Sequence, residues 1–216
     1  MMNSCRIKPE SFDIKNILSP ETIDSLKIKT FQKGNILYYN PSLGIQLFIF
    51  KNGRAKVVFF DDGESFTLYN LGANSIFVLE ENSTIEFSSE SELYVLDAKV
   101  FSRLFENVQF SNLILASMVK SLEIERGIIK TLVFNDCKKR VISFMLDIAN
   151  TVGSKQDNGI LIDLTMNIGE LSDFIASKRQ TISAVLHVLM EDGLLDKIDY
   201  TKYLIKDIVA LKRELA

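Results

Sequence analysis

Few side chains in this sequence could hold a metal or act as a catalytic nucleophile. The 216 residues include one histidine, His187, and two cysteines, Cys5 and Cys137. One chain therefore cannot build a three-histidine zinc centre, a two-histidine iron centre, a four-cysteine zinc site or a four-thiolate iron–sulfur cluster. The sequence also offers no Ser/His/Asp set and no glycine-rich phosphate loop, so we expect no enzyme and no metal site.

The most informative spacing of polar residues lies between Leu164 and Leu195. Asn167 is followed three residues later by Glu170, and Ser177 by Gln180, and each pair predicts a capping box at the start of a helix. The two predicted helices, 168–175 and 178–190, are joined by about two residues. Helices this close must cross steeply, which indicates a helix-turn-helix. A predicted hairpin at 194–205 then forms a wing, and a short helix covers 208–215.

The run from Glu170 to Ser183, Glu-Leu-Ser-Asp-Phe-Ile-Ala-Ser-Lys-Arg-Gln-Thr-Ile-Ser, resembles the DNA-binding motif of the Crp/Fnr superfamily of bacterial transcription regulators. In that motif an Arg-Glu-Thr-Val/Ile-Ser-Arg core opens the recognition helix. The resemblance extends over about residues 30–215 and implies an α+β fold. Its parts are an N-terminal antiparallel β-barrel or roll, a long dimerisation helix and a C-terminal winged helix-turn-helix.

The resemblance also assigns roles to single residues. Arg179 stands where the family places a guanine-reading arginine, whose fork matches guanine O6 and N7 in the major groove. Gln180 replaces a common glutamate and could pair with adenine, or could serve only as the cap partner of Ser177. Ala184 replaces a frequent second arginine, so we expect a different half-site. The other predicted DNA contacts are Lys178 and Thr181 to phosphates, Ser183 to a base edge or phosphate, and Lys202 on the wing.

The N-terminal half has the rhythm of short strands. Five glycines, from Gly34 to Gly72, recur every nine or ten residues, and the dipeptides Asn52-Gly53 and Asp62-Gly63 favour type I′ hairpin turns. Twelve of the fifteen phenylalanines precede residue 111. We therefore expect residues 30–97 to form a small antiparallel barrel or roll with a phenylalanine-filled interior. The predicted strands are 36–39, 47–50, 56–60, 65–71, 76–79 and 93–96.

Residues 109–134 carry a helical apolar period with a coiled-coil seam. We expect this helix to pair with its copy in a dimer, although it could alternatively lie on its own barrel. The expected division of the chain is a sensor domain at 1–108, this dimerisation helix at 109–134 and a DNA-binding domain at 135–216. The predicted dimer-interface residues are Leu115, Met118, Leu122, Glu125, Ile129 and Leu132.

The sequence does not identify the signal to which the expected regulator would respond. The stretch Ala73–Glu92, where cyclic-nucleotide-binding relatives resemble one another in a phosphate cassette, contains five glutamates and no Gly, Arg or Lys. A phosphate needs backbone donors or a cation, so cyclic nucleotides are not expected to bind. An iron–sulfur cluster is also not expected, because one chain supplies only two cysteines. Four alternatives stay open: haem held by Cys, Met or Tyr, a thiol switch at Cys137, an apolar ligand in the barrel, and no ligand at all.

The charge balance weakens the expectation of strong DNA binding. Residues 135–216 hold 11 Lys and Arg against 12 Asp and Glu, a net charge of −1. We therefore expect modest, salt-sensitive affinity for an inverted-repeat operator. The alternative is a dimeric sensor or adaptor whose winged helix binds protein. With no apolar run long enough to span a membrane, we expect a cytoplasmic protein without a membrane partner, for which RNA polymerase is a possible further partner.

Overall fold

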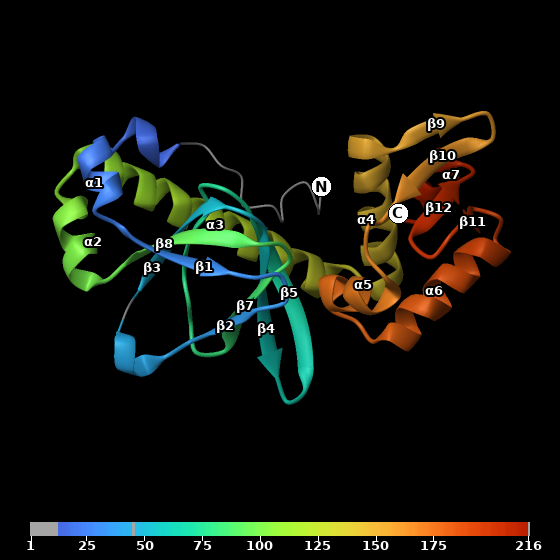
Figure 1. The fold of residues 1–216 in the computed structure, drawn as a ribbon. Helices are drawn as coiled ribbons and strands as arrows, with labels where there is room; N and C mark the ends of the chain where they lie inside the picture. The colour runs from blue at the N-terminus through green and yellow to red at the C-terminus, as the bar shows by residue number, and fades with distance from the viewer. Residues whose placement is uncertain (1–12, 45, 216) are drawn as a thin grey trace. The chain divides into compact units, whose positions relative to one another are not determined.

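The computed structural model describes residues 13–44 and 46–215, and its architecture is α+β (Figure 1). The described chain divides into two units at Glu125/Arg126, within the long helix α3 (Val108–Phe134). We refer to the part up to Glu125 as the N-terminal unit and to the rest as the C-terminal unit. The expected fold class is confirmed, whereas the boundaries 1–108, 109–134 and 135–216 stay predictions.

The N-terminal unit is a roll of two antiparallel four-stranded sheets, with strand orders β1-β8-β3-β6 and β2-β7-β4-β5. The sheets do not close into one cylinder, so the roll, rather than the barrel, describes them. Its strands are β1 (Lys27–Phe31), β2 (Ile36–Tyr38), β3 (Leu47–Asn52), β4 (Ala55–Asp61), β5 (Glu64–Leu71), β6 (Ile76–Val78), β7 (Ser83–Phe87) and β8 (Ser91–Leu96). Its short helices are η1 (Ile14–Asn16), α1 (Pro20–Asp24), η2 (Pro41–Leu43) and α2 (Ala98–Phe105). The strands β1 and β7 were not expected from the sequence.

Phenylalanine rings fill the space between the sheets, as predicted. Phe31 stacks on Phe87 with ring centroids 4.2 Å apart, and Phe48 stacks on Phe77 at 5.1 Å. Phe50 is fully buried between these two pairs and contacts both. Offset and stacked aromatic pairs add stabilisation beyond the apolar area that they bury. The contacts of Phe87 with Phe31 and Phe50 link the two sheets, whereas Phe48 and Phe77 lie on paired strands of one sheet.

One of the two predicted hairpin turns differs from expectation. Asp62 and Gly63 both have positive φ, of 45° and 81°, as a type I′ turn requires. At Asn52-Gly53 only the glycine has positive φ. Asn52 remains in β3 because its side-chain Nδ2 donates to Glu92 Oε2 at 2.7 Å and its side-chain Oδ1 accepts from the Glu92 backbone N–H at 3.0 Å. These cross-strand bonds keep Asn52 extended, and the prediction of a type I′ turn there was wrong.

Helix α3 has 27 residues and a length of about 40 Å. On one face, Phe110, Leu113 and Ile114 are buried in the core of the roll. Another face leaves large apolar side chains exposed, including Leu115 at 61% and Met118 at 58%. The helix therefore does lie on its own roll and still presents a second apolar stripe, so the two alternatives drawn from the sequence are compatible.

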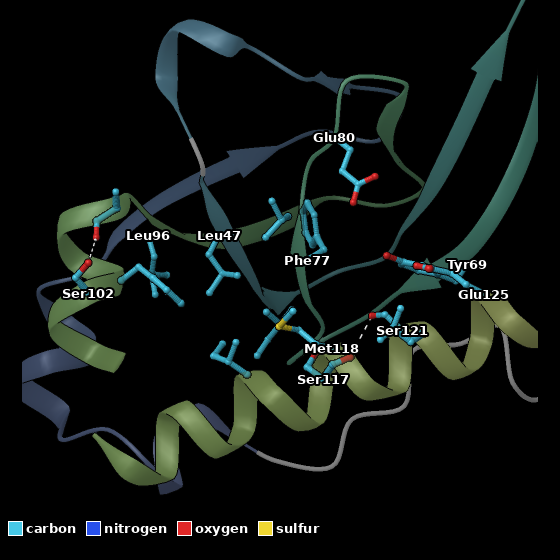
Figure 2. A pocket seen from close by; sticks show the side chains of 16 residues that line it. Leu47, Tyr69, Phe77, Glu80, Leu96, Ser102, Ser117, Met118, Ser121 and Glu125 are labelled. Atoms are coloured by element: carbon cyan, nitrogen blue, oxygen red, sulfur yellow. Dashed lines mark hydrogen bonds between the residues drawn. The ribbon is translucent and has the colours of Figure 1, made fainter. Parts of the chain in front are cut away.

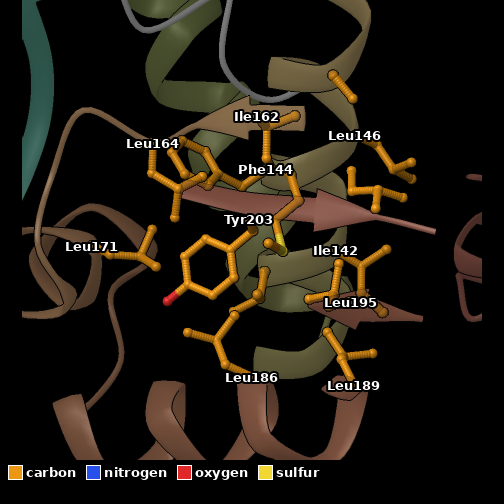
Figure 3. Packing of buried hydrophobic residues seen from close by; sticks show 14 of the residues in the cluster. Ile142, Phe144, Leu146, Ile162, Leu164, Leu171, Leu186, Leu189, Leu195 and Tyr203 are labelled. Atoms are coloured by element: carbon orange, nitrogen blue, oxygen red, sulfur yellow. The ribbon is translucent and has the colours of Figure 1, made fainter. Parts of the chain in front are cut away.

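The C-terminal unit packs helices around a four-stranded sheet of order β11-β12-β10-β9. Tyr203 on β12 is 1% exposed at its centre, surrounded by residues such as Leu171 and Leu186 (Figure 3). Its elements are α4 (Cys137–Val152), β9 (Ser154–Gln156), β10 (Gly159–Asp163), α5 (Ile168–Ile175), α6 (Arg179–Glu191), β11 (Leu195–Lys197), β12 (Lys202–Ile205) and α7 (Ile208–Arg213). This is a winged helix-turn-helix in which α5 and α6 are the paired helices and β11–β12 is the wing.

Candidate DNA interface

Helix α5 begins with the capping box that the sequence predicts. The Asn167 side chain accepts from the Glu170 backbone at 3.0 Å, and Glu170 accepts from the Asn167 backbone at 2.8 Å. Two of the N–H groups left without partners at the helix start are thereby satisfied. Leu171 and Ile175 are each 1% exposed, so this helix is fixed both at its end and along its buried face.

The second predicted capping box, Ser177 with Gln180, is not formed. Helix α5 ends at Ile175, and its C-cap Ala176 is in the left-handed conformation (φ 56°). The N-cap of α6 is Lys178, which makes no side-chain cap bond. The Ser177 backbone instead donates to Ser172 at 3.1 Å. Because the turn uses Ser177 in this way, α6 starts one residue later, and Gln180 is exposed rather than used as a cap partner.

Helix α6 separates a buried stripe from an exposed polar end. Ile182, Leu186 and Leu189 are at most 2% exposed and anchor the helix in the core. Within the described part of the chain, no side-chain hydrogen bond or ion pair engages Arg179. The first turn has no acidic residue and carries the positive end of the helix dipole, which favours phosphate. The predicted contact residues on this end are all exposed: Lys178, Arg179, Gln180, Thr181 and Ser183.

The wing brings Lys202 to the same unit but in a different electrostatic setting. Lys202 is exposed and lies opposite Asp163 in the pairing of β12 with β10. Hydrogen bonds from the Thr165 backbone and the Thr201 side chain, and then the nearby Lys202 charge, lower the pKa of Asp163. Asp163 thus stays ionised and offsets part of the Lys202 charge. At the wing tip Tyr200 is 86% exposed, a contact candidate that the sequence reasoning missed.

Arg140 on α4 positions the turn between α5 and α6. Its guanidinium donates to the carbonyl oxygens of Ile175 and Ala176, both at 3.1 Å, and to that of Asn135 at 3.0 Å. These carbonyls lie at the ends of α5 and α3, where backbone acceptors lack partners within the helix. The sequence shows Arg140 only as one member of the basic run Lys138-Lys139-Arg140, which gives no sign of this inward role.

The basic run on α4 is therefore not a free positive patch. Lys138 pairs with Glu214 at 2.7 Å, and that hydrogen bond raises the pKa of Lys138 by more than burial lowers it. Arg140 is directed to backbone carbonyls. The positive charge that remains exposed at the helix-turn-helix is concentrated at Lys178 and Arg179, consistent with a net charge of −1 over residues 135–216.

The residues predicted for the dimer interface lie along the exposed side of α3. Glu125 is half-buried. The five apolar members are exposed: Leu115 61%, Met118 58%, Leu122 48%, Ile129 59% and Leu132 37%. Their contact with a second chain stays a prediction. Among the described residues, no helix is long and apolar enough to cross a membrane, and no three His, Cys, Asp or Glu side chains cluster as metal ligands.

Comparisons with known proteins agree with this geometry. The chain is 23% identical over 181 residues to the global nitrogen regulator of Synechococcus elongatus, covering 79% of this chain and 82% of the relative. Its fold is similar to that of a CooA mutant from Carboxydothermus hydrogenoformans, with a TM-score of 0.77, 24% identity and coverage of 96% and 93%. A structure from Eubacterium rectale assigned to the Crp/Fnr family gives a TM-score of 0.70, 19% identity and coverage of 94% and 98%.

The match that bears on function covers the helix-turn-helix itself. Residues 139–214 match the family model of the Crp-like helix-turn-helix domain, a range that contains α5, α6 and the wing. The exposed polar end of α6 lies within it. These findings favour a DNA-binding protein over the adaptor alternative, and the chain is a DNA-binding transcription regulator with a Crp-like helix-turn-helix domain.

Proposed function

We propose that this regulator acts as a homodimer on an inverted-repeat operator. The observation that carries the proposal is the set of exposed polar side chains at the start of α6, on a helix that Ile182 anchors in the core. These side chains are Arg179, Gln180, Thr181 and Ser183. Each α6 enters a major groove with Arg179 directed to a guanine and Gln180 to an adenine. Two-fold symmetry sets the half-site centres about 34 Å apart, one turn of DNA.

The exposed stripe on α3 supports self-association. Large apolar side chains such as Leu115 and Ile129 recur there at coiled-coil spacing. A second copy of the helix is the partner that matches this spacing along its whole length. Dimerisation also compensates for the weak positive charge of each winged helix, because two half-sites are then bound at once.

Cyclic nucleotides are not the signal in this proposal. Within the described chain, Ala73–Glu92 spans β6, β7, the first two residues of β8 and the connections between them, and it contains no Lys, Arg or Gly to bind a phosphate. Two of its five glutamates are engaged by lysines from other strands, Glu86 with Lys56 at 2.9 Å and Glu92 with Lys51 at 3.1 Å. The other three add negative charge without such a salt bridge in the described residues. The glutamates would therefore repel a phosphate diester, and this stretch supplies no cationic side chain to bind it.

Selection of binding sites from random duplex DNA tests the proposal. Wild type should enrich an inverted repeat that contains G, and Arg179→Ala should lose it, with affinity about 10-fold to 100-fold lower for each half-site. Arg103→Ala, which removes an exposed arginine on α2 of the N-terminal unit, is the matched control and should retain the repeat. Enrichment that is unchanged in Arg179→Ala would contradict the assigned role of α6.

Sedimentation analysis tests the dimer separately. Ile129→Gln changes a 59% exposed seam residue and should shift the protein toward monomer. Lys130→Gln changes the adjacent exposed residue and should leave the dimer intact. Equal behaviour of the two variants would place the interface elsewhere.

A further inference from the structure

The N-terminal unit contains a cavity of about 460 Å³ between the roll and two helices (Figure 2). Its wall comes from β3, β5, β6 and β8 of the sheets and from α2 and α3. Every lining residue belongs to the N-terminal unit. The volume is within the range of cavities that hold small organic ligands.

Most of the wall is apolar. Leu47, Phe77 and Leu96 line it from the sheets, and Phe101, Ile114 and Met118 line it from the helices. Leu96 is fully buried, and Phe77 is held by its contacts with Phe48 and Phe50. The wall is thus preformed by the packing of the roll, and its chemistry suits an apolar or aromatic molecule.

One end of the cavity is polar and negative. Figure 2 shows Tyr69, Ser121 and Glu125 near one another at this end, away from Leu96. Ser121 hydrogen-bonds with Tyr69. Burial, followed by the negative charges of Glu125 and Glu80, raises the pKa of Tyr69 to about 12. Its phenol therefore keeps its proton at neutral pH and faces a negative field.

The described lining residues include no Lys, Arg or His to balance that field. An anionic ligand would lose its hydration and meet Glu80 and Glu125 without a countercharge from the lining. An uncharged ligand avoids both costs. It can bury its apolar part against Phe77 and Phe101 and place one hydrogen-bonding group beside the phenol or hydroxyls at the polar end.

We propose that this cavity binds an uncharged, predominantly apolar small molecule and discriminates against anions. The inference rests on the proposed function for its regulatory meaning, because Met118 and Leu122 line the cavity and also belong to the predicted dimer seam. A ligand in contact with these side chains changes the surface that α3 presents to a second copy. Such a ligand then shifts the population of dimer geometries according to its preference for one of them.

Two fluorescent probes with the same carbon skeleton test the ligand class. N-phenylnaphthylamine is neutral, and anilinonaphthalene sulfonate adds one anionic sulfonate. With the full chain, the neutral probe should bind saturably at one site per chain, and the sulfonate should bind at least about tenfold more weakly. Equal or tighter binding of the sulfonate would overturn the proposal.

Variants locate the probe and the origin of the discrimination. Ser117→Trp from α3 and, independently, Ser102→Phe from α2 place a bulky ring in the cavity, and each should abolish saturable binding of the neutral probe. The double variant Glu80→Gln with Glu125→Gln should reduce the ratio of the two affinities to about threefold or less. Glu123→Gln removes an exposed glutamate on α3 that does not line the cavity, and should leave the ratio unchanged.

The readout does not depend on DNA. Probe binding that persists at full strength in both blocking variants, each checked for a wild-type circular dichroism spectrum, would show that the cavity is not the site and would overturn the inference. Loss of the operator in the site-selection experiment, with probe binding intact, would instead contradict the proposed function alone. The two proposals therefore fail separately.

Discussion

The cavity of the N-terminal unit and the exposed end of α6 in the C-terminal unit carry opposite charge. Glu80 and Glu125 line the cavity with no cationic side chain among its described lining residues. Lys178 and Arg179 open α6, whose first turn has no acidic residue. The net charge of the chain, −3, predicts neither environment. The comparison teaches that the placement of a few charges, rather than their sum, decides which ligands a surface accepts.

Salt should separate the two sites by the largest margin. If about two or three cations per subunit contact DNA, operator affinity should fall about 100-fold to 1000-fold between about 50 mM and about 200 mM salt, because released counterions no longer favour binding. Binding of the neutral probe should change less than about twofold, since no charge is neutralised. Fluorescence anisotropy and probe titrations measure the two affinities.

A matched variant sharpens this test. Lys178→Gln should reduce the slope of log affinity against log salt by about two in a dimer, because each subunit loses one phosphate contact. The variant should leave probe affinity unaltered. A slope equal to that of wild type would remove Lys178 from the DNA interface.

Arg140 tests whether the α6 site depends on rigid support as well as on charge. Arg140→Met should lower the free energy of opening of the C-terminal unit by about 3 kcal/mol, because three carbonyls lose a charged donor. Hydrogen exchange of the α5 and α6 amides measures this loss. Arg140→Lys keeps the charge but cannot reproduce the three hydrogen bonds of the forked guanidinium, so it should recover only about 1 kcal/mol of the lost free energy. Full recovery by lysine would contradict the role of the fork.

Tyr69 tests the negative environment of the cavity. Its pKa in the folded protein, about 12, lies above the ordinary value of 10.0, so the unfolded chain loses the proton first as pH rises. The stability of the N-terminal unit should therefore be unaffected by this group below pH 10 and fall by about 2 kcal/mol toward pH 12. Urea unfolding of wild type and Tyr69→Phe at both ends of this range measures the difference. A parallel pH dependence of the two proteins would contradict it.

The smallest expected effect concerns the start of α5. Asn167→Ala should cost about 1 kcal/mol, because the Glu170 backbone N–H loses its acceptor at the helix end. Hydrogen exchange at the first turn of α5 reports the loss. Probe binding in the N-terminal unit should not change, and a change there would show that the two sites are coupled more strongly than this local cap predicts.

Local signals explain why much of the C-terminal unit could be predicted. Asn167 and Glu170 mark a helix start with side chains three residues apart, and the stripe Ile182, Leu186 and Leu189 has helical spacing. These cues need no distant partner, so the bounds of α5 and α6 agree with the prediction to within one residue. The phenylalanine core of the roll was likewise evident from composition and turn spacing.

Contacts between distant residues explain where prediction failed. Asn52 remains extended because Glu92, forty residues away, holds its side chain. The predicted capping box at Ser177 does not form because the Ser177 backbone N–H donates to Ser172 in the turn after α5. The role of Arg140 was missed because its acceptors, the carbonyls of Ile175 and Ala176, are distant from it in the sequence. The strand β7 was not predicted because it has only two large apolar residues, Ile85 and Phe87, within a mostly polar stretch.

Residue types and their spacing along the chain are enough to identify the motif at the start of α6, the helical seam of α3 and the scarcity of metal ligands. Three other features become visible only in the folded chain: Arg140 supports the helix-turn-helix, α3 both packs on the roll and leaves a stripe exposed, and a negative cavity lies between strands and helices. Those features depend on which distant side chains meet, and that is fixed by packing rather than by local spacing.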